Sequence, residues 1–157
     1  MRRALIGYLG ALACFVAIDA VWLGVLMGPH YRAQLGPLLL ESPRWPAALA
    51  FYLLYGVGLV VFAVLPALQQ GGRQRSTRLG ALLGTVAYAT YDLSNLATLR
   101  DWPLGLSLID IAWGALLSAL AASAGLLLAI RARRRGGGAK GQVPSRPRRV
   151  HRRMLCG

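Results

Sequence analysis

Three aspartates lie inside stretches of the chain that are otherwise apolar: Asp19, Asp92 and Asp110. A carboxylate at the depth of a bilayer is unfavourable by ~2.5–3.5 kcal/mol on insertion scales. Such a residue therefore faces a partner, a cavity or a pathway rather than lipid. The three aspartates predict an intramembrane site that binds a ligand or a proton.

The chemistry available to such a cluster is proton and cation binding. Burial favours the protonated form of a carboxyl group, and neighbouring carboxylates favour it further. Hard metal ions also take oxygen ligands, but the sequence assigns no residue to a metal and predicts no cofactor. The two cysteines, Cys14 and Cys156, have neither disulfide-framework nor zinc-site spacing.

The polar residues around Asp92 fall on two faces of one predicted helix. The first face carries four residues at the spacing i, i+3, i+4 and i+7, namely Tyr88, Tyr91, Asp92 and Asn95. The second carries Thr90, Ser94 and Thr98. A helix with two polar faces is expected to be the one most enclosed by protein.

An aspartate and a tryptophan three residues apart occur twice, as Asp19 with Trp22 and as Asp110 with Trp113. Each pair shares a helix face. If the two helices are antiparallel, Asp19 lies level with Trp113, and Asp110 with Trp22. An indole N–H donates and an ionised carboxylate accepts, which predicts reciprocal Asp–Trp hydrogen bonds. The alternative is a pair of interfacial tryptophans beside unrelated aspartates.

Aromatic side chains and one loop are placed to complete a pocket. Phe51, Tyr52 and Tyr55 reach the level of the aspartates, either as pocket walls or as membrane-interface anchors; we assign Tyr55 to the site. The loop 28–46 is long enough to fold over the pocket. Its Arg32 or Arg44 is expected to neutralise a carboxylate, and His30 is expected to be solvated.

Four apolar runs must position these residues, at about 4–27, 47–68, 79–99 and 104–130. Each is close to or above the ~20 residues that span a bilayer, and 56% of the chain is hydrophobic. The sequence predicts an all-α, polytopic four-helix transmembrane bundle as one domain, residues 1–130. A helical rise of ~1.5 Å per residue puts all three aspartates in the outer half. The first run continues to Met27, so we expect a span rather than a cleaved signal peptide.

The basic residues predict the orientation of the bundle. Fifteen of the 18 lysines and arginines precede the first run, separate the second from the third, or follow the fourth. The positive-inside rule then places both termini in the cytoplasm, in a bacterial inner membrane. Residues 131–157 are predicted to be a disordered basic tail, which acts as a topology signal or attracts anionic lipid. Nucleic-acid binding is not expected, because no aromatic residue interleaves the basic ones.

Several segments resemble a family of small bacterial membrane proteins defined only as a domain of unknown function. They are Asp19-Ala-Val-Trp22-Leu-Gly24, Phe51-Tyr52-Leu-Leu-Tyr55-Gly56, Val61-Phe62-Ala-Val-Leu-Pro66, the run Gly80 to Thr98, Trp102-Pro103 and Asp110-Ile-Ala-Trp113-Gly114. The resemblance covers about residues 4–125, with Ser94 where threonine is expected. It implies a four-helix inner-membrane protein and brings no activity, substrate or catalytic residue.

Three functions are open at this stage. The first is binding, or helping to transport, a proton, a cation or a small amphipathic ligand; since four spans make a thin wall, transport would need a homodimer or a partner membrane protein. The second is a structural or accessory subunit whose aspartates bond helices together, at ~0.6 kcal/mol per interhelical bond. The third, and least favoured, is an enzyme of lipid or isoprenoid metabolism, for which paired carboxylates supply acid–base groups.

Overall fold

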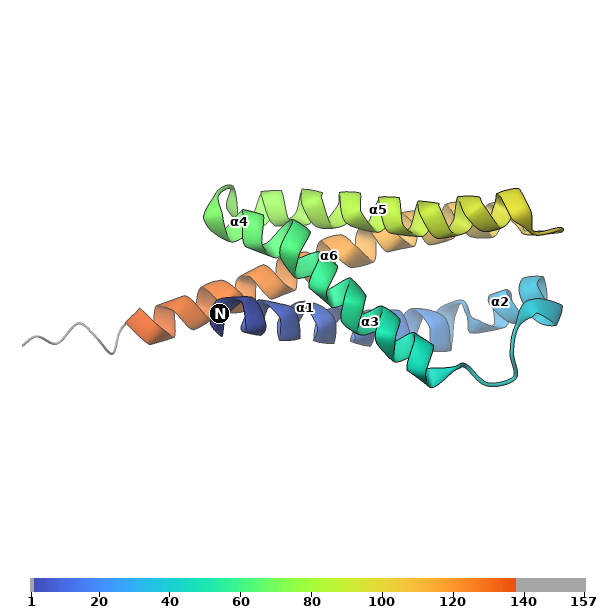
Figure 1. The fold of residues 1–157 in the computed structure, drawn as a ribbon, viewed down its shortest axis with the longest axis horizontal. Coiled ribbons are helices and arrows are strands. Elements are labelled where there is room, and N and C mark those ends of the chain that lie inside the picture. The colour runs from blue at the N-terminus through green and yellow to red at the C-terminus, as the bar shows by residue number, and fades with distance from the viewer. Residues whose placement is uncertain (1, 138–157) are drawn as a thin grey trace, which may run out of the picture.

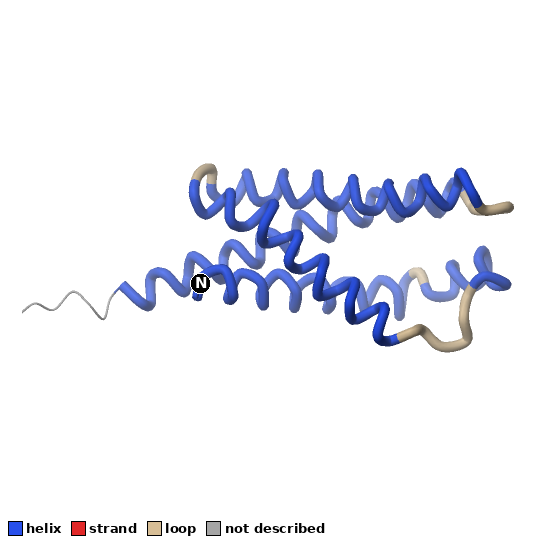
Figure 2. The backbone as a smooth tube through the Cα atoms, in the orientation of Figure 1, coloured by secondary structure: helices blue, strands red, loops and turns tan. Residues whose placement is uncertain are grey.

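The structure, a computed structural model, describes residues 2–137, and its regular elements are all helical (Figures 1 and 2). The first long segment is α1 (Arg2–Val21) with the π-helical turn η1 (Trp22–Leu26), followed by α2 (Gly28–Leu35) and the short η2 (Gly36–Leu38). The second is α3 (Trp45–Leu59), the π-helical η3 (Val60–Val64) and α4 (Leu65–Gln69). The third is α5 (Gly72–Thr98), and the last is α6 (Leu104–Gly137).

The predicted helical class is confirmed, and three segments are long and apolar enough to cross a membrane: Arg2–Leu26, Trp45–Gln69 and Leu104–Ala132. Helix α5 is long enough, but its polar residues leave it outside that group. It begins seven residues before the predicted start at 79, and α6 runs past the predicted end at 130. The rest of the predicted basic tail, 138–157, lies outside the described residues.

Proline and glycine set the helix boundaries. Pro29 and Pro46 lie in the first turns of α2 and α3, where a missing N–H costs no hydrogen bond. Gly71 has a φ of 90° in the turn that joins α4 to α5, a conformation that glycine adopts without strain. The π-helical segment η3 ends at Val64, two residues before Pro66 in the first turn of α4.

Helix α6 is the central element, because it packs closely against both α1 and α5. On one side, a Cβ added to Gly80 of α5 would lie 2.6 Å from the carbonyl oxygen of Ser118, and one added to Gly84 would collide with the carbonyl of Gly114. On another side, a Cβ on Gly125 would lie 2.6 Å from the carbonyl oxygen of Gly7. Gly80 and Gly84, spaced four residues apart on α5, therefore allow this helix to approach α6 at backbone distance.

The expectation that α5 is the most enclosed helix is wrong; more of α6 is buried. The second polar face of α5 is exposed, and its hydroxyls bond to carbonyls of the same helix. Thr90 donates to Val86 at 2.7 Å, and Thr98 donates to Ser94 at 2.7 Å. A hydroxyl satisfied in this way needs no neighbouring helix.

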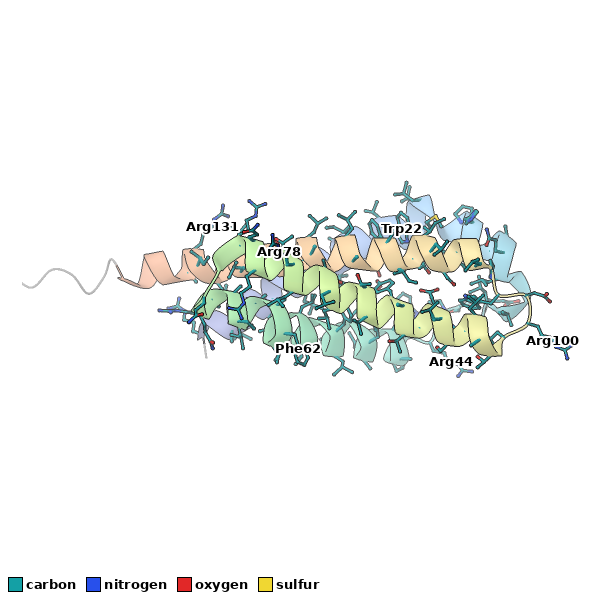
Figure 3. The ribbon with its side chains drawn as sticks, turned by 90° about the horizontal axis from the view of Figure 1, so that it is seen from above. Trp22, Arg44, Phe62, Arg78, Arg100 and Arg131 are labelled. Atoms are coloured by element: carbon teal, nitrogen blue, oxygen red, sulfur yellow. The ribbon has the colours of Figure 1, made fainter. Side chains whose placement is uncertain are left out.

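The outside of the molecule is rich in large apolar side chains, with Leu54, Phe62 and Leu108 each more than half exposed. Figure 3 shows Phe62 pointing away from the helices, and places Arg78 and Arg131 toward one end of the molecule and Arg44 and Arg100 toward the other. An exposed apolar belt of this extent is unusual for a soluble monomer. It suits contact with lipid.

Gly84→Ala is expected to lower the free energy of unfolding by about 1–3 kcal/mol, the usual cost of overpacking. The added methyl has no room beside the Gly114 carbonyl. Gly58→Ala is the matched control, because the nearest atom to its Cβ would be Leu83 Cδ2 at 3.8 Å. Thermal unfolding in detergent micelles measures both. Equal melting temperatures for the two variants would contradict the close packing.

Candidate functional site

A cavity of about 540 Å³ lies among the helices at the level of Asp19 and Asp110. Its lining comes from α1 and η1, α2, α3, α5 and α6, and comprises Asp19, Trp22, Leu23, Tyr31, Ala48, Phe51, Tyr52, Tyr55, Ala87, Tyr88, Tyr91, Asp110 and Trp113. Eight of these residues are aromatic. The volume is within the range of ~300–1,000 Å³ that small-molecule pockets occupy.

Asp19 joins three helices through its carboxylate. The Tyr52 hydroxyl of α3 donates to one oxygen at 2.8 Å, and the Trp113 indole N–H of α6 donates to the other at 3.3 Å. The side chain is only 4% exposed. The predicted Asp19–Trp113 hydrogen bond is confirmed, and both donors are electrically neutral.

Asp110 is covered by α2, which folds over the end of the cavity. The Tyr31 hydroxyl donates to Asp110 Oδ1, and Asp110 is 7% exposed. Burial, and then the contact with Asp110, raise the pKa of Tyr31, so its hydroxyl stays a neutral donor at physiological pH. The expectation that Arg32 or Arg44 pairs with a carboxylate is not met here, because the side chain that reaches Asp110 is a tyrosine.

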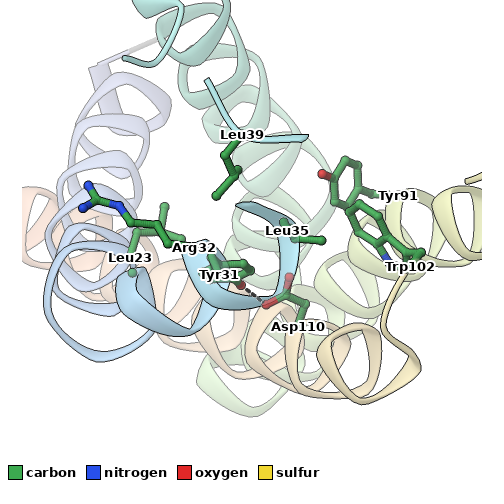
Figure 4. Close-up of a pocket in the computed structure, with 9 residues that line it drawn as sticks. Leu23, Tyr31, Arg32, Leu35, Leu39, Tyr91, Trp102 and Asp110 are labelled. Carbon is green, nitrogen blue, oxygen red and sulfur yellow. Dashed lines mark hydrogen bonds between the residues drawn. The ribbon is translucent and has the colours of Figure 1, made fainter. Parts of the chain in front are cut away.

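A second cavity, of about 310 Å³, adjoins the first across the Tyr31–Asp110 contact. Tyr31, Tyr91 and Asp110 line both cavities, and Figure 4 shows the Tyr31–Asp110 hydrogen bond at the edge of the second. Arg32 lines the second cavity. His30 contacts Gln34 on the exposed surface of α2, as expected for a solvated histidine.

The two tryptophans stack on each other instead of forming two reciprocal pairs. Their ring centroids are 4.0 Å apart and the planes differ by 8°. The Trp22 indole nitrogen is buried with no hydrogen-bond partner among the described residues. The predicted Trp22–Asp110 hydrogen bond is therefore wrong. Stacking on Trp113 fixes the plane of the Trp22 indole, and the donor that reaches Asp110 is the Tyr31 hydroxyl.

Asp92 is set apart from this cavity. It is 0% exposed on α5, does not appear in the lining of either cavity, and no described protein group forms a hydrogen bond with either carboxyl oxygen. Ser107 of α6 lies close to Asp92 without meeting the geometry of a hydrogen bond to it, and its hydroxyl accepts from the Trp102 indole at 2.9 Å. Of the four polar residues on the first face of α5, Tyr88 and Tyr91 therefore line the larger cavity, whereas Asp92 and Asn95 do not.

The structure thus brings together seven of the nine sequence-assigned residues, all except Asp92 and Asn95. The Tyr88 ring lies against Gly114, and the Tyr55 hydroxyl lies 2.7 Å from Ser118 Oγ. The assignment from sequence left out Tyr31 and Tyr52, which hold the carboxylates. Their only sequence signal is a tyrosine at the level of a buried acid. Residues 2–137 contain no group of three or more acids, histidines or cysteines arranged to hold a metal.

Comparison with known proteins gives one match. A family model described as "Predicted membrane protein (DUF2177)" matches residues 4–127. No curated protein and no solved structure matches the chain.

Tyr52→Phe removes one of the two donors to Asp19 and leaves a buried carboxylate with less stabilisation. We expect the free energy of unfolding to fall by about 1–3 kcal/mol. Tyr8→Phe is the control, since the Tyr8 hydroxyl makes only an exposed 3.3 Å contact with the Leu53 carbonyl. Chemical or thermal unfolding in micelles compares them, and a Tyr52→Phe loss no greater than that of Tyr8→Phe would contradict the role given to this bond.

Proposed function

The chain belongs to the DUF2177 family of predicted membrane proteins, and from that premise we propose that it binds a small amphipathic cation in the aromatic cavity, between Asp19 and Asp110. The observation that carries the proposal is a pair of buried carboxylates whose hydrogen-bond donors are all neutral.

Charge balance supports a positively charged ligand. Tyrosine and indole donors stabilise an anion by hydrogen bonding but do not cancel its charge. A buried carboxylate is expensive unless it is paired. A cation between Asp19 and Asp110 would supply the missing charge, whereas an anionic ligand would add to the repulsion.

The cavity walls support the same class of ligand. Trp22, Trp113 and five tyrosines line the cavity, and the face of an aromatic ring attracts a cation within ~6 Å of its centroid. The remaining lining is apolar. A molecule with a cationic head and an apolar body matches both parts of the surface.

The route into the cavity is favourable for a molecule dissolved in the bilayer. Figure 1 shows α3 diverging from α5 beyond the segment where α4 and η3 pack against α5. Phe51 of α3 and Tyr91 of α5 line the cavity and are 45% and 58% exposed. A ligand could therefore enter sideways between these helices.

The proposed setting is a bacterial inner membrane with four spanning segments and both termini in the cytoplasm. Helix α5 would be the fourth span, because its Asp92 and its glycines face α6 and its exposed hydroxyls bond internally. The positive-inside rule supports the orientation. The basic residues beyond Ile130 would then form a cytoplasmic extension.

A structural role is the second candidate, favoured by one observation. The contacts of Asp19 join α1, α3 and α6, so the carboxylate could serve only to hold the helices together. This role requires no ligand and no ionised pair.

Asp19→Asn and Asp110→Asn should each weaken binding of the amphipathic cation benzyldodecyldimethylammonium. Loss of one charge-assisted contact of about 1.5–3 kcal/mol corresponds to roughly a 10–100-fold rise in Kd. The protein is held in phosphatidylcholine nanodiscs, and binding is followed by the fluorescence of its tryptophans, two of which line the cavity.

Asp101→Asn is the matched control, because Asp101 is exposed and its positive φ of 56° suits asparagine. Benzyl dodecyl ether tests the need for charge. If the ether binds as tightly as the cation, or if the cavity variants bind the cation like Asp101→Asn, the cation proposal fails. A lower melting temperature for Asp19→Asn, together with no saturable binding of the cation to the wild-type protein, would favour the structural role.

The orientation is tested by single cysteines at Gln70 and at Glu41, in a background without Cys14 and Cys156. With both termini cytoplasmic, an impermeant maleimide added outside intact cells should label the cysteine at Glu41 and spare the one at Gln70. Labelling of both positions from outside would exclude this topology.

A further inference from the structure

The three buried aspartates differ in the number of protein groups that stabilise their charge. Asp19 accepts from Tyr52 and Trp113, and Asp110 accepts from Tyr31. Asp92 accepts from no described group, although it is the least exposed of the three, at 0%. The ionised form is therefore stabilised by two hydrogen bonds at Asp19, by one at Asp110, and by none from a described group at Asp92.

This order decides where a proton would reside. An ionised carboxylate buried without partners is so unfavourable that the group takes up a proton instead. Hydrogen bonds to the charged form act in the opposite direction and favour ionisation. Among these aspartates, Asp92 has the environment of a neutral acid, and Asp19 has the environment of an anion.

We propose that Asp92 is a proton-binding site outside the ligand cavity, occupied in the ligand-free protein and linked electrostatically to Asp110. The inference goes beyond the proposed function, since a proton on Asp92 does not depend on cation binding.

The link follows from the position of Asp92 against α6. Its neighbour Ser107 and Asp110 are three residues apart on α6 and share a helix face. The titratable groups that face Asp92 are Asp110 of α6, Tyr31 of α2 and Tyr91 of its own helix. Tyrosine is neutral at physiological pH, so Asp110 is the neighbour whose negative charge favours a proton on Asp92.

Because Asp110 also lines the cavity, its charge would link cation binding in the cavity to proton binding at Asp92. A cation beside Asp110 would offset the negative charge that holds the proton on Asp92. Cation binding would then favour proton release, and proton binding would favour cation release, as reciprocity between linked sites requires.

Infrared spectroscopy tests the proton site directly in the reconstituted full-length protein at neutral pH. With ¹³C at the aspartate side-chain carboxyls, we expect the carbonyl band of a protonated acid in the wild type and in Asp101→Asn, and its loss in Asp92→Asn. Asp92→Glu retains a carboxyl group and should move the band from the ¹³C to the ¹²C position. Absence of the band in the wild type, or its persistence at the ¹³C position in both Asp92 variants, overturns the proposal.

The link is tested by titrating the same band in Asp110→Asn. Removing the neighbouring charge should shift the loss of the band toward lower pH, relative to the wild type. The Asp101→Asn titration should match the wild type. A curve for Asp110→Asn that coincides with the wild-type curve would leave Asp92 as an isolated proton site and exclude the exchange. All these measurements omit the cation, so they can fail or succeed separately from the ligand-binding experiment.

Discussion

The arrangement of the helices depends on how closely α6 approaches its neighbours. Gly80 and Gly84 of α5 meet the backbone of α6 at Ser118 and Gly114, and Gly125 of α6 meets the backbone of α1 at Gly7. Between lipid-immersed helices the hydrophobic effect offers little drive for association, so close packing and polar contacts take its place. The glycines let one helix contact two others at backbone distance, and that contact sets the levels of Asp19, Asp92 and Asp110 relative to one another.

The same packing explains why the cavity lies where it does. The glycine contact between α5 and α6 extends to Gly114, where the ring of Tyr88 fills the space that a side chain would occupy. Beyond that level most of the cavity lining is aromatic, and α3 diverges from α5 (Figure 1). Aromatic side chains therefore line a space that they do not fill, and the carboxylates of Asp19 and Asp110 face it. Tight packing at one end and an open aromatic cavity at the other are consequences of where glycine gives way to tyrosine and tryptophan.

The three aspartate carboxyl groups are chemically identical, but their surroundings favour different protonation states. Two lie beside the cavity and are held by neutral donors, and one is enclosed between α5 and α6 with no hydrogen-bond partner in the described part of the chain. Free energies of ionisation in a low-dielectric setting respond strongly to such differences. An arrangement of this kind separates a group suited to bind a cation from a group suited to hold a proton, with Asp110 adjacent to both.

The sequence by itself determined the helical class, three apolar segments long enough to span a membrane, the burial of the three aspartates and the pairing of Asp19 with Trp113. These follow from apolar run length, the cost of a lipid-facing charge and helical periodicity, which are local properties. Only the tertiary structure decided that Tyr31 and Tyr52 hold the carboxylates, that Trp22 stacks on Trp113, that α6 rather than α5 is central, and that Asp92 lies outside the cavity. Periodicity fixes which residues share a face. The rotation of each helix about its axis, and the path of α2 over the end of the cavity, depend on contacts between segments far apart in the chain.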